Sequence, residues 1–172
     1  RILLLGASGM LGHKLCQYLS LHPGGPRVYA TIRSDSPGPF LDRLKDGVQF
    51  ITGIDAREAE SLRVSFEVSR PNVVINCIGL VKQRMARPDR RIAIELNALL
   101  PHILSDIAQR FAARLVHIST DCVFDGRRGH YSESDTPNAL DIYGNTKALG
   151  EVTRDHCTTL RTSIIGHELG ST

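Results

Sequence analysis

The chain has 172 residues, a formal net charge of +3 and 41% hydrophobic residues, so we expect about one domain with a sizeable buried core. Acidic and basic residues are interspersed, a pattern that gives no sign of a nucleic-acid-binding surface. No stretch approaches the roughly 20 apolar residues of a membrane span, and no charged and then apolar leader precedes the first apolar run, which together predict a soluble cytoplasmic protein.

The cysteines and histidines lack the spacing of a metal site. Cys16, Cys77, Cys122 and Cys157 contain no Cys-x-x-Cys pair, and the seven histidines show no ligand spacing either. Widely separated cysteines are typical of free thiols in a reducing compartment rather than of a disulfide framework. We therefore expect no metal centre, and no membrane or nucleic-acid partner.

A glycine-rich turn follows the first apolar run, Arg1 to Leu5, whose continuous hydrophobicity predicts a parallel strand buried on both faces. The turn has the spacing Gly-x-x-Gly-x-x-Gly and precedes a predicted helix. Its glycines let the backbone approach a pyrophosphate closely, and the helix N-terminus presents free N–H groups to it. The helix is expected to turn four residues inward: Leu11, Leu15, Tyr18 and Leu19. We predict these cofactor contacts: Gly6, Ser8, Gly9, Met10, Leu11 and Gly12.

The end of the second predicted strand, Arg27 to Ile32, indicates which nicotinamide cofactor is preferred. Dinucleotide folds commonly place an acid there to hold the adenosine ribose, but this strand ends without a carboxylate and continues into Arg33. A guanidinium can pair with a 2′-phosphate. We therefore expect NADP rather than NAD, which stays the alternative, as does a solvated Arg33. A loop rich in Ser, Pro and Gly follows, to Pro39.

Two further strands are expected in the middle of the chain. The first is Val48 to Ile51, with Asp55 at a turn before a helix from about Arg57 to Ser69. The second runs from Pro71 to Gly79 and ends in small residues, so a flat cofactor could lie across its end. A basic segment comes next, and it is either a solvated loop or a surface for substrate phosphates. Its cations are Lys82, Arg84, Arg87, Arg90 and Arg91.

A long helix is predicted from about Ile92 to Phe111, with Pro101 kinking or breaking it. The residues at core spacing are Leu96, Leu99, Leu100, Ile103, Leu104 and Ile107. Asn97 is the polar exception on this helix. A buried asparagine there serves either as a structural hydrogen-bonding residue or as an organiser of the catalytic site.

The fifth predicted strand, Arg114 to Ser119, delivers the sequence Ser119-Thr120-Asp121 to the carboxyl edge of the sheet, where open α/β proteins bind ligands. His117 within it is expected to be a core residue. A sixth strand is predicted from Thr158 to Ile165. The alternation of strands and helices predicts a Rossmann-type doubly wound parallel α/β sheet with helices on both faces.

Tyr143 and Lys147 lie between the fifth and sixth strands, one turn apart on a predicted helix. An adjacent ammonium favours the phenolate, so we expect Lys147 to lower the tyrosine pKa. This would make Tyr143 a suitable acid for reducing a carbonyl.

Four motifs together resemble those of the extended short-chain dehydrogenases/reductases, over essentially the whole chain. They are the glycine turn, Asn76-Cys77-Ile78-Gly79, Ser119-Thr120-Asp121 and Tyr143-x-x-x-Lys147. Within that superfamily, the segments Ser119 to Gly126, Tyr143 to Lys147 and Arg161-Thr162-Ser163 are similar to the dTDP-4-dehydrorhamnose reductase branch. That branch uses a nicotinamide cofactor to reduce the 4-keto group of a nucleotide-linked deoxysugar, a step toward cell-surface polysaccharide precursors.

The resemblance implies roles for matching residues. Thr120, Tyr143 and Lys147 become the catalytic trio, with Tyr143 as proton donor and Lys147 on the cofactor ribose. Asp55 is placed near the adenine. Further cofactor contacts are Asn76, Cys77, Ile78, Gly79, Asn97, Ser119, Tyr143 and Lys147. Expected substrate contacts are Asp121, Cys122 and Ile164.

Two positions depart from the branch, because Cys122 and Ile164 stand where rhamnose-forming members have aromatic residues that help bind the sugar. The sugar is therefore open. Members also continue past the sixth strand into a substrate lobe, so we expect residues 1–172 to form the cofactor domain and the lobe to lie beyond residue 172. The alternative is a non-catalytic NADP-binding regulatory subunit resembling the methionine adenosyltransferase β subunit. A homodimer is compatible with either.

Overall fold

Six parallel strands form one sheet in the order β3-β2-β1-β4-β5-β6. The structure is a computed structural model that describes residues 1–22, 24–81 and 90–166. The strands are β1 (Ile2–Leu5), β2 (Val28–Thr31), β3 (Val48–Ile51), β4 (Val73–Asn76), β5 (Arg114–Thr120) and β6 (Cys157–Thr162). The order reverses between β1 and β4, which confirms the predicted doubly wound parallel α/β fold.

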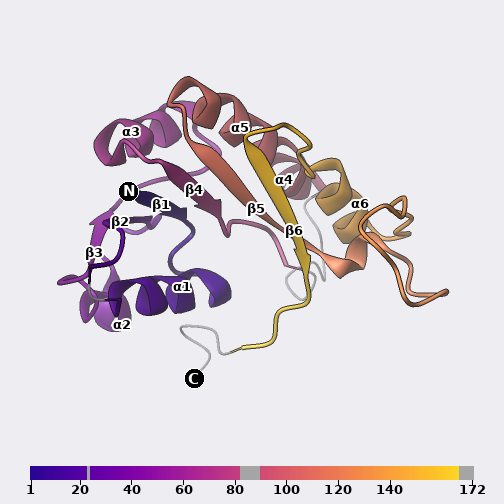
Figure 1. Ribbon diagram of the computed structural model, residues 1–172, viewed down its shortest axis with the longest axis horizontal. Coiled ribbons are helices and arrows are strands. Elements are labelled where there is room, and N and C mark those ends of the chain that lie inside the picture. The colour runs from indigo at the N-terminus through magenta and orange to yellow at the C-terminus, as the bar shows by residue number, and fades with distance from the viewer. Residues whose placement is uncertain (23, 82–89, 167–172) are drawn as a thin grey trace.

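Helices cover both faces of the sheet (Figure 1). Helices α1 (Met10–Ser20) and α2 (Gly38–Asp42) lie on one face, below the sheet in the view shown. The other face carries α3 (Ala59–Ser69), α4 (Arg90–Ala93), α5 (Leu100–Arg110) and α6 (Ile142–Leu149). Right-handed crossovers explain the division, because connections that run toward β3 and connections that run toward β6 must pass on opposite sides.

Strand β1 separates two apolar cores. Leu3 and Leu5 face the α3 and α5 side, where they join a cluster with Phe66 and Leu104. Leu4 faces α1 and packs in a second cluster that includes Cys16. All three leucines of β1 are fully buried. This two-sided burial is the physical reason for the uninterrupted apolar run at the start of the sequence.

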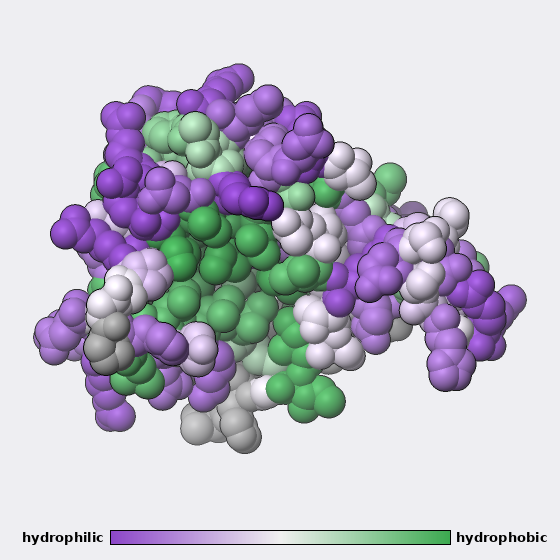
Figure 2. Space-filling view, viewed as in Figure 1, coloured by the Kyte–Doolittle hydropathy of each residue, from purple (hydrophilic) through white to green (hydrophobic). Residues whose placement is uncertain are grey.

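The β4–β6 half of the sheet is less covered on the α1 side. In register with Leu4 lie Ile75 of β4 and Val116 of β5, and both are only partly buried. Leu160 of β6, on the same side, is 46% exposed. Figure 2 shows apolar surface gathered over the middle of the molecule beside α1. The two halves of the sheet therefore differ in how completely their apolar residues are covered.

Helix α1 differs from the prediction at one of the four residues expected on its inner side. Tyr18 is 61% exposed, while Gly12, His13 and Cys16 are its buried residues. Leu15 and Leu19 are partly buried, as expected of the predicted inner side. Small residues at positions 12 and 16 let the helix approach the sheet closely, and this close approach outweighs the larger apolar area of Tyr18.

Several boundaries differ from the sequence expectations; strand β4, for example, ends at Asn76 rather than at Gly79. Helix α2 begins inside the region predicted as loop, with Pro39 in its first turn, where proline is favoured. Strand β6 ends at Thr162, so Ile164 and Ile165 lie beyond it. Of the basic segment, Lys82, Arg84 and Arg87 lie outside the described residues, whereas Arg90 and Arg91 begin α4.

The long helix changes its hydrogen-bond register before Pro101. A π-helical turn, η2 (Ile94–Leu99), joins α4 to α5, and the Leu100 N–H bonds to the Glu95 carbonyl five residues earlier. Pro101 lies in the first turn of α5, where its missing N–H disrupts no hydrogen bond of the helix. Because the wider turn shifts the helical phase, Asn97 is fully buried and Leu99 is 51% exposed, contrary to its predicted core position.

Candidate active site

The glycine turn between β1 and α1 is closed by backbone contacts. Gly6 has a φ of +86°, a conformation that favours glycine. A Cβ on Gly12 would lie 2.1 Å from the Gly6 carbonyl oxygen. Helix α1 begins at Met10, and its N-cap residue is Gly9. Gly9 has no side chain that could accept a hydrogen bond from the first N–H groups of the helix. The turn therefore presents open donors at a helix N-terminus, with Ser8 exposed beside them.

The predicted adenine-side residues lie at the ends of β2 and β3. Arg33 is exposed, directly after the buried Ile32. Asp55 accepts hydrogen bonds from Arg57: 3.0 Å from the backbone N–H, 3.1 Å from Nε and 2.6 Å from Nη2. These bonds lower the pKa of Asp55 to about 2. Asp55 also lines a cavity of about 320 Å³, shared with Leu99 and Ile103.

Asn76 and His117 connect β4 and β5 at the carboxyl edge. The Asn76 amide Nδ2 donates to His117 Nδ1 at 3.1 Å, and its Oδ1 accepts the Ile78 N–H at 3.0 Å. His117 is fully buried, and burial lowers its pKa to about 3, so the ring is neutral. Asn76 thereby shapes the Cys77 to Gly79 segment predicted to follow the cofactor. Burial raises the Cys77 pKa to about 12, which keeps that thiol protonated.

Asn97 makes hydrogen bonds to two other segments of the chain. Its Oδ1 accepts the Leu80 N–H at 2.8 Å, while its Nδ2 donates to the Leu80 carbonyl at 3.1 Å and to Thr146 Oγ1 at 3.4 Å. One side chain of the π-helical turn thus joins the segment after β4 to helix α6. A Cβ on Gly79 would lie 3.2 Å from Asn97 Oδ1, so Asn97 also borders that segment.

Thr120 and Tyr143 meet at the end of β5. Thr120 Oγ1 accepts the Cys122 N–H at 3.2 Å and lies 3.2 Å from Asp121 Oδ1, to which it donates. A hydrogen bond with Thr120 lowers the Tyr143 pKa, but burial acts more strongly, and the net pKa is raised. The expectation that Lys147 lowers this pKa is wrong, because desolvation disfavours the phenolate. Tyr143 is therefore protonated at neutral pH.

Lys147 is buried behind the tyrosine, with 5% of its surface exposed. Its Nζ donates to the Ile118 carbonyl at 2.7 Å. Burial lowers the Lys147 pKa to about 8, while the charge of Glu151 acts to raise it. At neutral pH the ammonium form prevails, and a Cβ on Gly79 would lie 3.8 Å from Nζ. The ammonium thus borders the segment predicted to follow the cofactor.

A partly buried ion pair lies beside Lys147, and the sequence patterns do not predict it. Glu151 accepts from Arg161 Nε and Nη2, both at 2.8 Å, and from Ser119 Oγ at 2.8 Å. The two charged side chains are 11% and 22% exposed. One signal was available in the sequence, since Glu151 follows Lys147 by four residues, the spacing of neighbours on a helix face. Its partners, however, lie on β5 and β6 and emerge only from the fold.

The predicted substrate residues fall into two places. Asp121 is exposed and Cys122 is half-buried, and both act electrostatically on Tyr143. Ile164 lies past β6 and is 41% exposed. The structure thus brings Asp121 and Cys122 beside the tyrosine. Arg33 and Asp55 are instead grouped at the β2–β3 end of the same edge.

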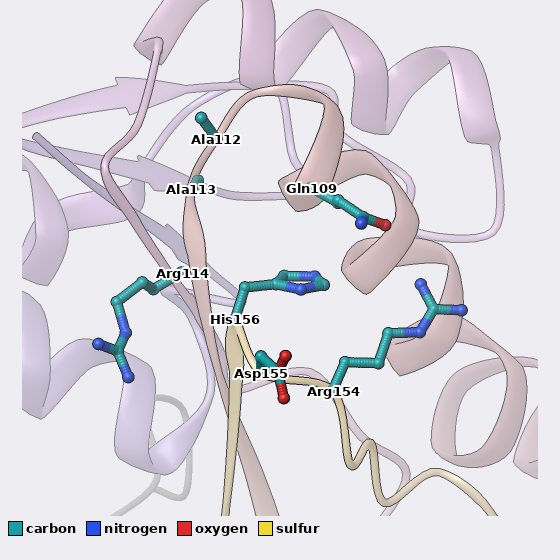
Figure 3. Close-up of a pocket in the computed structure, with 7 residues that line it drawn as sticks. All are labelled: Gln109, Ala112, Ala113, Arg114, Arg154, Asp155 and His156. Carbon is teal, nitrogen blue, oxygen red and sulfur yellow. The ribbon is translucent and has the colours of Figure 1, made fainter.

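A larger cavity, of about 540 Å³, lies at the opposite edge of the sheet, where β5 and β6 begin (Figure 3). Arg114 and Arg154 extend to opposite sides of His156 in it. Because these cations point away from each other, they form no common anion site. Thr120, Tyr143 and Lys147 lie at the other, carboxyl edge of the sheet. None of the helices within the described ranges is long and apolar enough to cross a membrane. The same residues contain no group of three or more potential metal ligands.

Comparison with known proteins finds similarity to dTDP-4-dehydrorhamnose reductases and to a subunit of methionine adenosyltransferase. The model of the family described as RmlD substrate binding domain matches residues 1–170. The β subunit of methionine adenosyltransferase 2 from Xenopus tropicalis is 29% identical over 154 residues, which cover 88% of this chain and 41% of that protein. The dTDP-4-dehydrorhamnose reductase of Aggregatibacter actinomycetemcomitans is 32% identical over 152 residues, covering 88% and 45%.

Two solved structures share the fold. A hypothetical dTDP-4-dehydrorhamnose reductase from Sulfolobus tokodaii superposes with a TM-score of 0.77 at 29% identity, covering 94% of this chain and 55% of that one. The Bacillus anthracis dTDP-4-dehydrorhamnose reductase, in complex with NADP, gives 0.66 at 27% identity, covering 87% and 47%. The chain therefore spans about half the length of the proteins it matches.

Proposed function

The chain belongs to the RmlD substrate binding domain family, and on this premise we propose that it is part of an NADPH-dependent reductase of a 4-keto nucleotide sugar. The observation that carries the proposal is the grouping of Thr120, Tyr143 and Lys147 at one sheet edge, with Tyr143 held protonated. A protonated phenol is the form required to donate a proton to a ketone oxygen.

The residues of the carboxyl edge suit a dinucleotide. The close approach of Gly12 to Gly6 leaves no room for a side chain and keeps the α1 N-terminus open for a pyrophosphate. Arg33, exposed after β2, would pair with a 2′-phosphate, and Asp55 would lie on the adenine side. When bound, NADPH supplies the hydride. A solved relative at 27% identity contains NADP, which supports the cofactor class.

Each member of the trio has a defined task in the proposed reaction. Thr120 would hydrogen-bond the keto oxygen and orient it beside the phenol. Tyr143 would give its proton to that oxygen as carbon 4 receives the hydride, so that the ketone becomes an alcohol. Lys147 would hold the cofactor ribose with its ammonium and stabilise the tyrosinate that forms. Asp121, Cys122 and Ile164 would contact the sugar.

The second candidate is a non-catalytic NADP-binding regulatory subunit. The observation that favours it is the similarity to the methionine adenosyltransferase β subunit, at 29% identity against 32% for a reductase. Fold and sequence similarity alone do not separate the two candidates.

Single-turnover oxidation of NADPH by the full-length protein, with a panel of 4-keto nucleotide sugars, separates the candidates. For a reductase, Tyr143→Phe should slow the chemical step by on the order of 10²-fold while leaving NADPH affinity nearly unchanged. Tyr18→Phe is the matched control, because Tyr18 is 61% exposed on α1. Equal rates for wild type and Tyr143→Phe, or no oxidation with any sugar, would contradict the reductase proposal and favour the regulatory one.

We further propose that residues 1–172 form the cofactor domain of a cytoplasmic protein, with the substrate lobe in the remainder of the full-length protein. The lengths support this division, since this chain covers 41% and 45% of its relatives. A homodimer stays compatible with this arrangement. Analytical ultracentrifugation of the full-length protein would test the oligomeric state.

A further inference from the structure

We propose that the partly buried pair Glu151–Arg161 sets the charge of Lys147, with Glu151 as a positioning residue that keeps the ammonium protonated and Arg161 limiting that effect. The charge coupling is a property of this chain alone. Its consequence for hydride and proton transfer rests on the proposed function.

Adjacent residues of β5 anchor the ammonium and the carboxylate, one through its backbone carbonyl and the other through its side-chain hydroxyl. Lys147 Nζ donates to the carbonyl of Ile118 at 2.7 Å, and Ser119 Oγ donates to Glu151 Oε1 at 2.8 Å. Both side chains therefore reach back from the α6 segment to the same stretch of one strand. They form no direct ion pair in the described part of the chain, so their coupling acts through space.

The position of Glu151 on the chain supports the same arrangement. It follows Lys147 by four residues, just beyond the end of α6 at Leu149, as Lys147 follows Tyr143. Arg161 holds the carboxylate through two bonds of 2.8 Å, so the charge is fixed in place rather than mobile. A fixed charge in a buried setting acts on its neighbours more strongly than a solvated one.

Four other side chains that the structure describes near Lys147 carry no charge at neutral pH. Cys77, at the end of β4, is protonated because burial raises its pKa to about 12. His117 of β5 is neutral because burial lowers its pKa to about 3. Tyr143 on the same helix is protonated, and Asn97 of η2 cannot titrate. Glu151 is thus the anion that counteracts the desolvation of the ammonium, and Arg161 is the cation beside it.

The proposal predicts that substituting Glu151 and substituting Arg161 shift the titration of Lys147 in opposite directions. Glu151→Gln removes a negative charge, so Lys147 should lose its proton at lower pH. Arg161→Gln removes a positive charge and leaves Glu151 unneutralised, so Lys147 should hold its proton to higher pH. If the pair only supported the fold, breaking it from either end would disturb the site in the same direction.

Titration of Lys147 by NMR tests the proposal without any substrate. In the full-length protein labelled at lysine side chains, the Lys147 signal is the one missing from Lys147→Arg. Its midpoint should lie at about pH 8 in the wild type. It should fall by roughly one pH unit in Glu151→Gln and rise by roughly half a unit in Arg161→Gln. Shifts of the same sign, or no shift in either variant, would overturn the proposal.

Arg161→Lys is the conservative control, since it keeps the positive charge beside Glu151 and should leave the Lys147 midpoint near its wild-type value. If Glu151→Gln does not fold, the Arg161→Gln and Arg161→Lys variants decide the matter alone. A midpoint that rises equally in both would contradict an electrostatic role. Loss of reductase activity with every sugar would refute the proposed function while leaving the titration result intact.

Discussion

The two halves of the sheet edge present polar groups in different ways. At the β1–α1 end, the groups are backbone N–H donors, and the fold depends on the absence of side chains at Gly6 and Gly12. At the β5–α6 end, the groups are buried polar side chains. Lys147 is 5% exposed there, and Asn97 and His117 are fully buried.

This difference indicates how each half responds to change. A backbone site is sensitive to volume, because an added Cβ has no space, but it has nothing to titrate. A side-chain site in a low-dielectric environment is sensitive to charge and protonation, since each buried polar group requires a partner. Added volume should therefore disturb both halves, because a Cβ on Gly144 or Gly150 of the α6 segment would also lie 2.2 Å or 1.9 Å from a backbone oxygen. Changes of pH should act mainly on the second half.

The largest effect should come from Gly12→Ala, which tests the sensitivity of the first half to volume. The new Cβ would lie 2.1 Å from the Gly6 carbonyl oxygen, so β1 and α1 must separate. We expect a loss of about 3 kcal/mol in the free energy of unfolding, at the upper end for overpacking. Urea denaturation measures it.

Gly9→Ala is the control within the same turn. Its Cβ would meet the Gly6 carbonyl oxygen at 3.4 Å, an ordinary contact, and its φ is −77°. The free energy of unfolding should therefore change by only about 0.5 kcal/mol. Equal losses for both variants would show that volume is not what this turn restricts.

The second effect tests the sensitivity of the other half to pH. Burial lowers the His117 pKa from 6.5 to about 3. A depressed pKa means that this stability is fully present above pH 6.5 and is lost as the pH falls toward 3. At pH 5 the loss should be about 2 kcal/mol. Urea denaturation at pH 7 and pH 5 measures it.

His117→Gln should remove this part of the pH dependence, while His22→Gln, on an exposed residue, should retain it. A wild-type free energy of unfolding that is constant between pH 7 and pH 5 would contradict a neutral buried His117. The conclusion that the β5–α6 half is the one sensitive to pH would then be wrong.

The sequence predicts the backbone half better than the side-chain half, for physical reasons. Glycines at positions 6, 9 and 12 act locally, so their spacing after an apolar run is sufficient. The pair Asn76–His117 joins β4 to β5, and Glu151–Arg161 joins the segment after α6 to β6, so strand order is needed before either can be inferred. The error on the Tyr143 pKa has the same origin, since burial is a property of the fold.

Helix phase is the other feature that local patterns miss. The sequence predicts Tyr18 on the inner side of α1, but the buried residues of this helix are the smaller Gly12, His13 and Cys16. Leu99 was predicted inward from regular α-helical spacing, and the π-helical turn displaces it. In both cases a backbone contact overrides the apolar pattern.

A smaller effect concerns cofactor choice at the β2 end. Arg33→Ala should weaken NADPH binding by about tenfold, the value of an exposed charge-assisted hydrogen bond, and should spare NADH. Fluorescence titration of the full-length protein measures both affinities, and Arg43→Ala is a control on another exposed arginine. Equal affinities of the wild type for NADPH and NADH would show that Arg33 does not discriminate.

The smallest effect should come from the exposed end of an aromatic stack beside the β5–α6 half. Arg161 lies over Phe124 at 5.0 Å, Phe124 stacks on Tyr131 at 4.2 Å, and Arg128 lies over Tyr131 at 4.8 Å. The two arginines thus make similar ring contacts, but the side chain of Arg161 is 22% exposed and that of Arg128 is 59% exposed. Solvent screens the outer cation and its ion pair with Asp135.

Arg128→Gln should therefore change the melting temperature by at most about 2 °C and leave NADPH affinity unaltered. Arg161→Gln removes the same kind of ring contact, but it also leaves the Glu151 carboxylate buried without its guanidinium, so its loss should be clearly larger. Differential scanning calorimetry on both variants measures the contrast. Similar losses would mean that the ring contacts, rather than burial of the charge pair, stabilise this side of the site.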